Sequence, residues 1–170
     1  MNSLVNEELQ SKVMAVLAPQ AQYRNGRFNV KIVFVVDDNQ TNLKSASDAL
    51  ENTYNVYTIS SGMKMFKLAK KIMPDLILLD VEMPEMDCFE TMERLKADGR
   101  LGQVPVIFLT ARQDALTEMR GLELGALDFI NKLFSPPILL KRIETHLGTD
   151  KLIKETKASL RDIQNAMISV

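Results

Sequence analysis

The chain has 170 residues, a net charge of −1 and a composition that is 46% hydrophobic and 25% charged. These values are typical of one folded domain with extensions, and they exclude a largely disordered chain. The balanced charge gives no electrostatic basis for nucleic-acid binding by this chain.

Several other classes are excluded by simple features of the sequence. No apolar run is long enough to span a membrane, and the N-terminus lacks a basic and apolar secretion signal, so we expect no membrane contact. The single cysteine, Cys88, cannot form an intrachain disulfide, which favours a reducing, cytoplasmic location. Because His146 is the only histidine, a structural zinc site is excluded, and His146 is interpreted as a helix-face residue.

The first 29 residues are predicted to form an extension of their own. Apolar residues spaced as on one face of a helix predict a helix over residues 4–17. Pro19 and the polar stretch over residues 20–29 are interpreted as a linker. We therefore assign residues 1–29 to an N-terminal helix and linker.

Strands and helices then alternate five times. Continuous apolar and β-branched runs predict strands over residues 31–36, 55–60, 75–80, 104–110 and 127–131. Helices are predicted over residues 42–50 and 61–72, from the Asp87 cap to near Gly99, from an Asp114 cap to Gly125, and after Ser135-Pro136. Buried strands that alternate with helices predict an α/β domain over residues 30–148, with a parallel sheet covered on both faces.

The last segment has a different period. From Ile153 to Val170, apolar positions follow at alternating steps of three and four, the pattern of a helix that pairs with another helix. We predict a long connector helix over residues 149–170 that pairs in a homodimer; packing on its own domain is the alternative. No glycine, proline or basic cap closes this helix before Val170, so we expect further sequence in the parent protein.

Polar side chains follow the predicted strands at their carboxyl ends, where parallel α/β proteins place their functional sites. These residues are Asp37, Asp38, Asp80, Thr110 and Lys132. Three carboxylates in one pocket require a cation, and oxygen ligands suit Mg²⁺. A lysine and a hydroxyl beside that ion would bind a phosphoryl group. Taken singly, each residue also has a local explanation, and an Asp-Asp pair after a strand most often caps the next helix.

The segments "VVDDN", "LILLDVEMPEMD", "VIFLTA" and "ALDFINK" resemble the receiver domain of two-component response regulators. The resemblance covers residues 31–147 and implies a flavodoxin-like fold, a five-stranded parallel sheet of strand order 2-1-3-4-5. It also implies a sensor histidine kinase or phosphotransfer protein as partner, and a downstream output domain that phosphorylation switches.

The resemblance assigns roles to the acidic residues. Asp80 matches the phosphoacceptor of the family. Asp37 and Asp38 match the acidic pair that holds Mg²⁺, together with Asp80 and the backbone carbonyl of Glu82. In this interpretation the ion neutralises charge that would repel an incoming phosphate.

Three further residues match the phosphate-binding and switch positions. Thr110 matches the hydroxyl that moves to bind the new phosphate, and Lys132 matches the lysine that contacts its oxygens. Phe129 matches the aromatic residue whose rotamer follows Thr110, and a plain core position is equally compatible with its apolar strand. These residues together would form a two-state element.

Two positions depart from the family pattern. Leu133 follows Lys132 where the family usually has proline, often after a cis peptide. Since a cis bond before a non-proline residue costs about 2.5–4 kcal/mol, we expect a trans peptide, a shifted loop and a Lys132 displaced from its usual position. Cys88 replaces a common glycine; with Asp87 as the N-cap it would be the first helical residue, where a side chain is allowed.

The tail "KLIKETKASLRDIQNAMISV" is similar to the helical connector that enters an HD-GYP cyclic-di-GMP phosphodiesterase domain. GGDEF-type cyclases use comparable connectors, and this chain has no His-Asp metal motif of such an enzyme, so we expect no separate catalytic domain in it. Two alternatives stay open. One is a degenerate receiver that is not phosphorylated and acts as an interaction adaptor. The other is a haloacid-dehalogenase-like phosphatase, which would need a second aspartate where Glu82 stands.

Overall fold

The computed structural model describes residues 22–24, 27–84, 86–111 and 115–148. The predicted helix over residues 4–17, the cap at Asp114 and the paired tail helix lie outside these ranges.

Five parallel strands form the central sheet. They are β3 (Ile32–Val36), β4 (Asn55–Ile59), β5 (Leu76–Asp80), β6 (Val106–Thr110) and β7 (Asp128–Asn131). Their order across the sheet is β4-β3-β5-β6-β7, and every neighbouring pair is parallel. Numbered along the chain from β3, this is the order 2-1-3-4-5 of a flavodoxin-like fold, which confirms the prediction.

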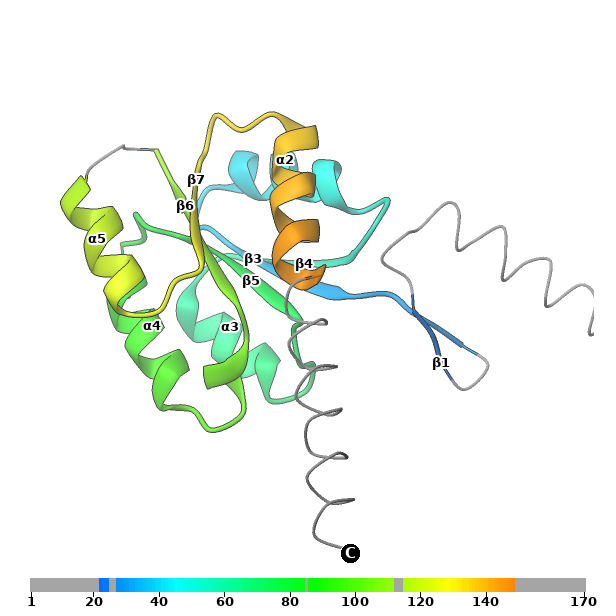
Figure 1. Ribbon diagram of the computed structural model, residues 1–170. Coiled ribbons are helices and arrows are strands. Elements are labelled where there is room, and N and C mark those ends of the chain that lie inside the picture. Colours follow the sequence, from blue (N-terminus) through cyan, green and yellow to red (C-terminus); the bar gives the residue numbers. More distant parts are fainter. Residues whose placement is uncertain (1–21, 25–26, 85, 112–114, 149–170) are drawn as a thin grey trace, which may run out of the picture.

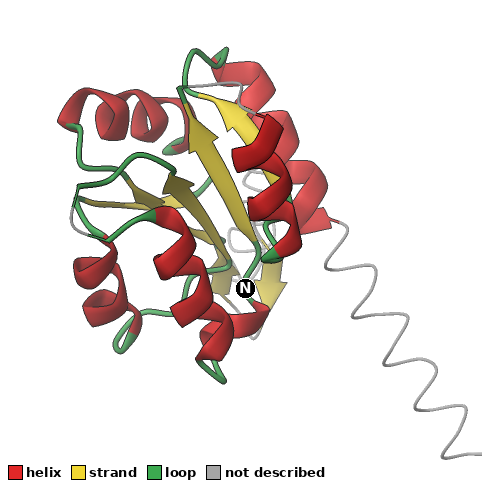
Figure 2. Ribbon diagram, turned by 90° about the vertical axis from the view of Figure 1, so that its left-hand side faces the viewer, coloured by secondary structure: helices red, strands yellow, loops and turns green. Residues whose placement is uncertain are grey.

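Helices connect the strands and cover both faces of the sheet. They are α2 (Gln40–Leu50), α3 (Gly62–Ala69), α4 (Cys88–Ala97), the short 3₁₀-helix η1 (Leu101–Gln103), α5 (Ala115–Glu123) and a last helix over residues 136–148. Figures 1 and 2 show α2 and the helix over residues 136–148 on one face, and α3, α4 and α5 on the other. None of the described helices has the length and hydropathy needed to cross a membrane.

The sheet separates two apolar layers because successive side chains of a strand point to opposite faces. In β3, Val33 and Val35 pack in the layer under α2, while Phe34 and Val36 pack in the layer under α3 and α4. Every residue of β5 and of β6 is buried. Since both faces of these strands are apolar, only the strand ends remain for polar side chains, and Asp80 is the last residue of β5.

Two of the predicted helix-end signals, Asp87 and Gly125, lie at observed ends of helices. The Asp87 side chain accepts a hydrogen bond of 2.7 Å from the backbone N–H of Glu90, which makes Cys88 the first residue of α4, as predicted. Gly125 closes the turn after α5 with φ +95°, a backbone conformation that favours glycine.

Within residues 20–29, which are interpreted as a linker, the structure describes two short strands, and the assignment of residues 1–29 to a helix and linker stays a prediction. β1 (Gln22–Arg24) and β2 (Arg27–Asn29) pair as antiparallel strands, with Gln22 opposite Asn29. The sequence signal that agrees with this pairing is the dipeptide Asn25-Gly26, which is strongly favoured in two-residue hairpin turns.

An ion cluster ties the helix over residues 136–148 to β7. Arg142 Nη1 donates to both carboxylate oxygens of Asp128, at 2.9 and 2.8 Å, and His146 Nε2 lies 3.2 Å from Asp128 Oδ2. His146 is therefore a helix-face residue, as predicted. Burial raises the pKa of Asp128, but the hydrogen bonds from Arg142 and His146 outweigh it and lower that pKa below its ordinary value.

Asp128→Asn should lower the free energy of unfolding by about 1 kcal/mol at neutral pH, the size of a partly exposed charge pair. Because the folded-state pKa of Asp128 is lowered, its stabilisation is complete above the unfolded-state pKa of about 3.9. It is then lost as the pH falls through the folded-state pKa. Urea denaturation of the wild type and the variant measures this difference.

The matched control is Asp48→Asn, which breaks an exposed pair with Lys44 and should change stability by at most about 0.5 kcal/mol. If Asp128→Asn lowers the free energy of unfolding as much at acidic pH as at neutral pH, the carboxylate charge is not what stabilises the helix.

Candidate functional site

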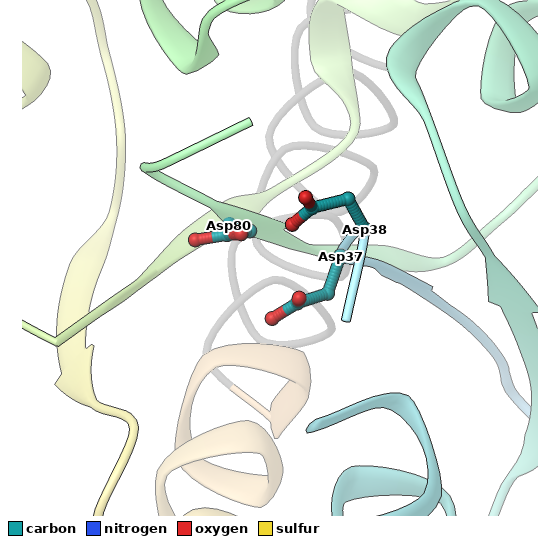
Figure 3. A group of neighbouring side chains, drawn as sticks. All are labelled: Asp37, Asp38 and Asp80. Atoms are coloured by element: carbon teal, nitrogen blue, oxygen red, sulfur yellow. The ribbon is translucent and has the colours of Figure 1, made fainter. Parts of the chain in front are cut away.

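Acidic residues from two neighbouring strands meet at the carboxyl edge of the sheet. Asp37 and Asp38 follow β3 directly, Asp80 ends β5, and β3 and β5 pair side by side. One carboxylate oxygen from each of these residues lies within 4.8 Å of the others. Figure 3 shows the three carboxyl groups gathered at these strand ends.

Asp37 is fully buried and held by the start of α2. Asn42 Nδ2 donates to Asp37 Oδ1 and Oδ2, at 3.2 and 3.1 Å, and the backbone N–H of Asn39 donates to Oδ1 at 2.8 Å. The N-cap of α2 is Asn39, not one of the aspartates. The local explanation of the Asp-Asp pair as a helix cap is therefore wrong. The neighbouring Asp38 is exposed to solvent.

Lys132 enters the cluster from the end of β7. Its Nζ lies 2.7 Å from Asp80 Oδ1 and 3.1 Å from Asp37 Oδ2, and only 14% of its side chain is exposed. Burial lowers the pKa of Lys132, but the hydrogen bonds to Asp80 and Asp37 outweigh it, so the pKa is raised. The ammonium group is therefore charged and shared between two buried acids.

The prediction of a displaced Lys132 is wrong, although the predicted trans peptide is confirmed, since the described residues contain no cis bond. The backbone N–H of Lys132 donates to the carbonyl of Thr110 at 2.8 Å, which continues the pairing of β7 with β6. Leu133 is 94% exposed, and its N–H donates to Asn131 Oδ1 at 3.0 Å. Its apolar side chain thus points to solvent and leaves Lys132 in the site.

Asp80 is fully buried, and its two oxygens have different surroundings. Oδ1 accepts hydrogen bonds from Lys132 and, at 2.9 Å, from the backbone N–H of Glu82. Oδ2 is buried with no hydrogen-bond partner. Burial raises the pKa of Asp80 to about 6, against the opposing hydrogen bonds of Lys132 and Glu82, and the nearby Asp37 adds to the rise.

The side-chain oxygens of Asp37, Asp38 and Asp80 are suitable ligands for Mg²⁺. They are all carboxylate oxygens, the ligands that this hard cation prefers, and the exposed Asp38 leaves room for the waters it usually keeps. A buried oxygen without a donor, as at Asp80 Oδ2, is the kind of atom that a cation would satisfy. The backbone carbonyl of Glu82, expected as a further ligand, stays a prediction.

Thr110 lies on β6, the strand next to that of Asp80, and Phe129 lies on β7, the strand beyond it. Thr110 ends β6 and is 8% exposed. Phe129, in β7, is partly buried and meets Phe108 edge to face at a centroid distance of 5.1 Å. In this structure Phe129 thus packs against the core, and its switching role stays a prediction.

The comparisons with known proteins agree with this geometry. The family model of the response regulator receiver domain matches residues 33–144. The chain belongs to this family. It is 35% identical over 119 residues to the polar-differentiation response regulator DivK of Brucella ovis, a match that covers 69% of this chain and 97% of DivK. The haloacid-dehalogenase-like alternative is left without support.

Two further matches differ in how much of the similar protein they cover. The chain is 36% identical over 115 residues to a probable cyclic di-GMP phosphodiesterase of Vibrio cholerae, covering 68% of the chain but only 26% of that protein. The solved structure of the Vibrio cholerae chemotaxis protein CheY4 has a TM-score of 0.66 and 28% identity, and the match covers 69% of this chain and 98% of CheY4.

Asp80→Asn removes a buried negative charge and should make the metal-free protein more stable. The rise of the Asp80 pKa from 3.8 to about 6 corresponds to about 3 kcal/mol. Because the folded-state pKa is the higher one, the wild type loses this stability between about pH 4 and about pH 6. Urea denaturation in the presence of a chelator should show that Asp80→Asn is more stable than the wild type by the full amount above this pH range. Below the range the two proteins should be equally stable.

Asp38→Asn is the control, because this exposed acid of the same cluster should change stability by less than about 1 kcal/mol. An Asp80→Asn variant that is no more stable than the wild type at neutral pH would contradict the electrostatic description of the site.

Proposed function

We propose that this receiver domain accepts a phosphoryl group on Asp80 from a sensor histidine kinase or phosphotransfer protein, in a Mg²⁺-dependent reaction. The observation that carries the proposal is the state of the Asp80 carboxylate. Its Oδ1 is held by Lys132 and Glu82, while its Oδ2 is buried without a hydrogen-bond donor. An oxygen without donors keeps its electron pairs available for a new bond.

In the proposed reaction Asp80 acts as a carboxylate nucleophile. A carboxylate oxygen of Asp80 forms a bond to phosphorus, and the bond between phosphorus and the imidazole nitrogen of the donor breaks. The imidazole leaves with the electron pair of that bond and takes up a proton. The product is an acyl phosphate on Asp80.

The other site residues serve this step through their charge. Mg²⁺, when held by Asp37, Asp38, Asp80 and the Glu82 carbonyl, would supply the positive charge that offsets repulsion between the acids and the phosphate. Lys132 offsets part of the negative charge of Asp37 and Asp80 before the transfer, and its ammonium can then contact the phosphoryl oxygens.

Thr110 and Phe129 would transmit the change. In the register of β6 and β7, Phe108 is opposite Phe129 and Thr110 is opposite Asn131, so Thr110 and Phe129 share one face of the sheet. Movement of the Thr110 hydroxyl towards the phosphoryl group would change the space beside the Phe129 ring. A local change of charge would thus bias a two-state element.

We further propose that a larger output domain is joined to the receiver domain through residues 149–170. The support for this output domain is the similarity to the longer Vibrio cholerae protein, described as a probable cyclic di-GMP phosphodiesterase. We also propose that the protein is a homodimer paired through residues 149–170 and that it is located in the cytoplasm. A degenerate receiver acting as an adaptor is the alternative. Asp37, Asp38 and Asp80 lie close together and Lys132 contacts Asp37 and Asp80, which favours the phosphorylated receiver.

Incubation with Mg²⁺ and acetyl phosphate tests the proposal directly. We expect mass spectrometry, after trapping of the acyl phosphate with borohydride, to find one phosphoryl group per chain, on Asp80. Asp80→Asn and chelation of Mg²⁺ should each abolish labelling, and Lys132→Met should slow it by a factor of about 100 or more. Asp48→Asn, a change in an exposed aspartate of α2, is the control that should label normally. Absence of labelling in the wild type would favour the adaptor.

Leu133→Pro restores the residue that the family usually has after the lysine. Because Lys132 already contacts Asp80 with Leu133 in solvent, we expect the labelling rate to stay within about twofold of the wild type. A large increase in the rate would show that Leu133 does hold the lysine away from its working position. The same mass-spectrometric time course measures it.

A further inference from the structure

We infer that Gly121 is a positioning residue for Phe129, because the side chain that Gly121 lacks leaves the space into which the Phe129 ring packs. Gly121 lies within α5, and its backbone is not in the left-handed region that would itself require glycine. The reason for glycine at this position is therefore space. The consequence for signalling rests on the proposed function of Asp80.

The space at Gly121 is filled by two aromatic rings. A Cβ atom at this position would lie 2.4 Å from Phe129 Cζ and 2.7 Å from Phe108 Cε2, whereas ordinary contacts of such an atom begin near 3.4 Å. Any other residue at position 121 therefore requires a ring or the helix to move.

Gly121 is also a point where α5 meets the core. It is the one buried residue among those of α5, whereas Leu116, Met119 and Leu122 of the same helix are 71%, 54% and 49% exposed. Figure 1 shows α5 beside the edge of the sheet that β6 and β7 form. The position of this helix thus depends on how closely it can approach the two rings.

Of the two rings next to Gly121, that of Phe129 can change its position more easily than that of Phe108. Phe108 is fully buried in β6 and is packed between Phe89 and Phe129, with centroid distances of 6.3 and 5.1 Å. Phe129 lies in the edge strand β7 and is partly exposed. A methyl group at position 121 would therefore disfavour the packed position of Phe129 and favour a position turned towards solvent.

This change in the position of Phe129 would affect the phosphorylation site, because Phe129 and Thr110 lie on the same face of the sheet. If binding of a phosphoryl group at Asp80 favours the packed Phe129 ring, a substitution that disfavours this ring position must weaken that binding, by at most the factor by which the two ring positions differ in affinity. Within a helix, alanine is intrinsically more stabilising than glycine. Weakened binding in an alanine variant would therefore not follow from helix propensity.

Gly121→Ala tests the inference with two readouts. Aromatic carbon NMR should show the Phe129 ring signals losing the ring-current shift from Phe108. Titration with beryllofluoride in saturating Mg²⁺ should show binding weakened about fivefold or more, with the affinity for Mg²⁺ alone unchanged. Unchanged ring signals together with unchanged beryllofluoride affinity would overturn the inference.

A second variant separates ring packing from general damage. In a Phe129→Leu background, where the ring is gone, Gly121→Ala should change beryllofluoride affinity by less than about twofold. Leu122→Ala, on the exposed side of α5, is the control and should resemble the wild type. An undiminished effect of Gly121→Ala without the ring would show that Phe129 is not the residue being positioned.

The two proposals fail in different ways. A wild type that binds no beryllofluoride would contradict the proposed phosphorylation, and the ring signals of Gly121→Ala would still decide the role of Gly121. A wild type that binds it, beside a Gly121→Ala variant with unchanged affinity and ring signals, would contradict only the role of Gly121.

Discussion

Two fully buried carboxylates lie side by side at the end of the sheet, and the rest of the site depends on how their charge is compensated. Asp37 and Asp80 share the ammonium group of Lys132, at 3.1 and 2.7 Å. Removing an ionised group from water costs several kcal/mol, and one lysine cannot neutralise two buried acids and a third nearby. The cluster therefore retains negative charge that a cation would compensate.

The fold forces these acids together and supplies the stability that offsets their cost. β3 and β5 are central strands whose apolar side chains fill layers on both faces of the sheet, so a polar residue can be placed only at a strand end. Neutral donors hold each acid in place, from Asn39 and Asn42 at Asp37 and from Glu82 at Asp80. Of the four oxygens of these two acids, only Asp80 Oδ2 is left without a hydrogen-bond donor, and the Tyr54 hydroxyl is the other such buried atom among the described residues.

Much of this architecture could be predicted from the sequence, because buried parallel strands are continuous apolar runs and helix ends carry local signals such as the Asp87 cap and Gly125. The strand order came from the family resemblance, since periodicity carries no information about which strands are neighbours. Once the sheet is known to be parallel, the proximity of Asp37, Asp38 and Asp80 can be predicted from their places at the strand ends. Their burial and their hydrogen bonds cannot be predicted in this way.

The errors and omissions have physical causes. The polar composition of residues 20–29 predicts a linker and does not reveal the pairing of β1 with β2. Peptide geometry alone predicts a displaced Lys132, but the pairing of β6 with β7 fixes its backbone, and the Leu133 side chain lies in solvent. The supporting role of Asn42 and the space at Gly121 depend on side-chain positions across the fold, which no local pattern specifies.

The pKa of the Asp80 carboxyl group is the quantity that tests this account most directly. It can be measured by following the side-chain carboxyl carbon of Asp80 in a pH titration by NMR, with and without Mg²⁺. We expect a pKa of about 6 without the ion, and a lower one when Mg²⁺ is bound. A pKa at or below about 4 without the ion, unchanged by Mg²⁺, would contradict the claim that uncompensated buried charge defines this site.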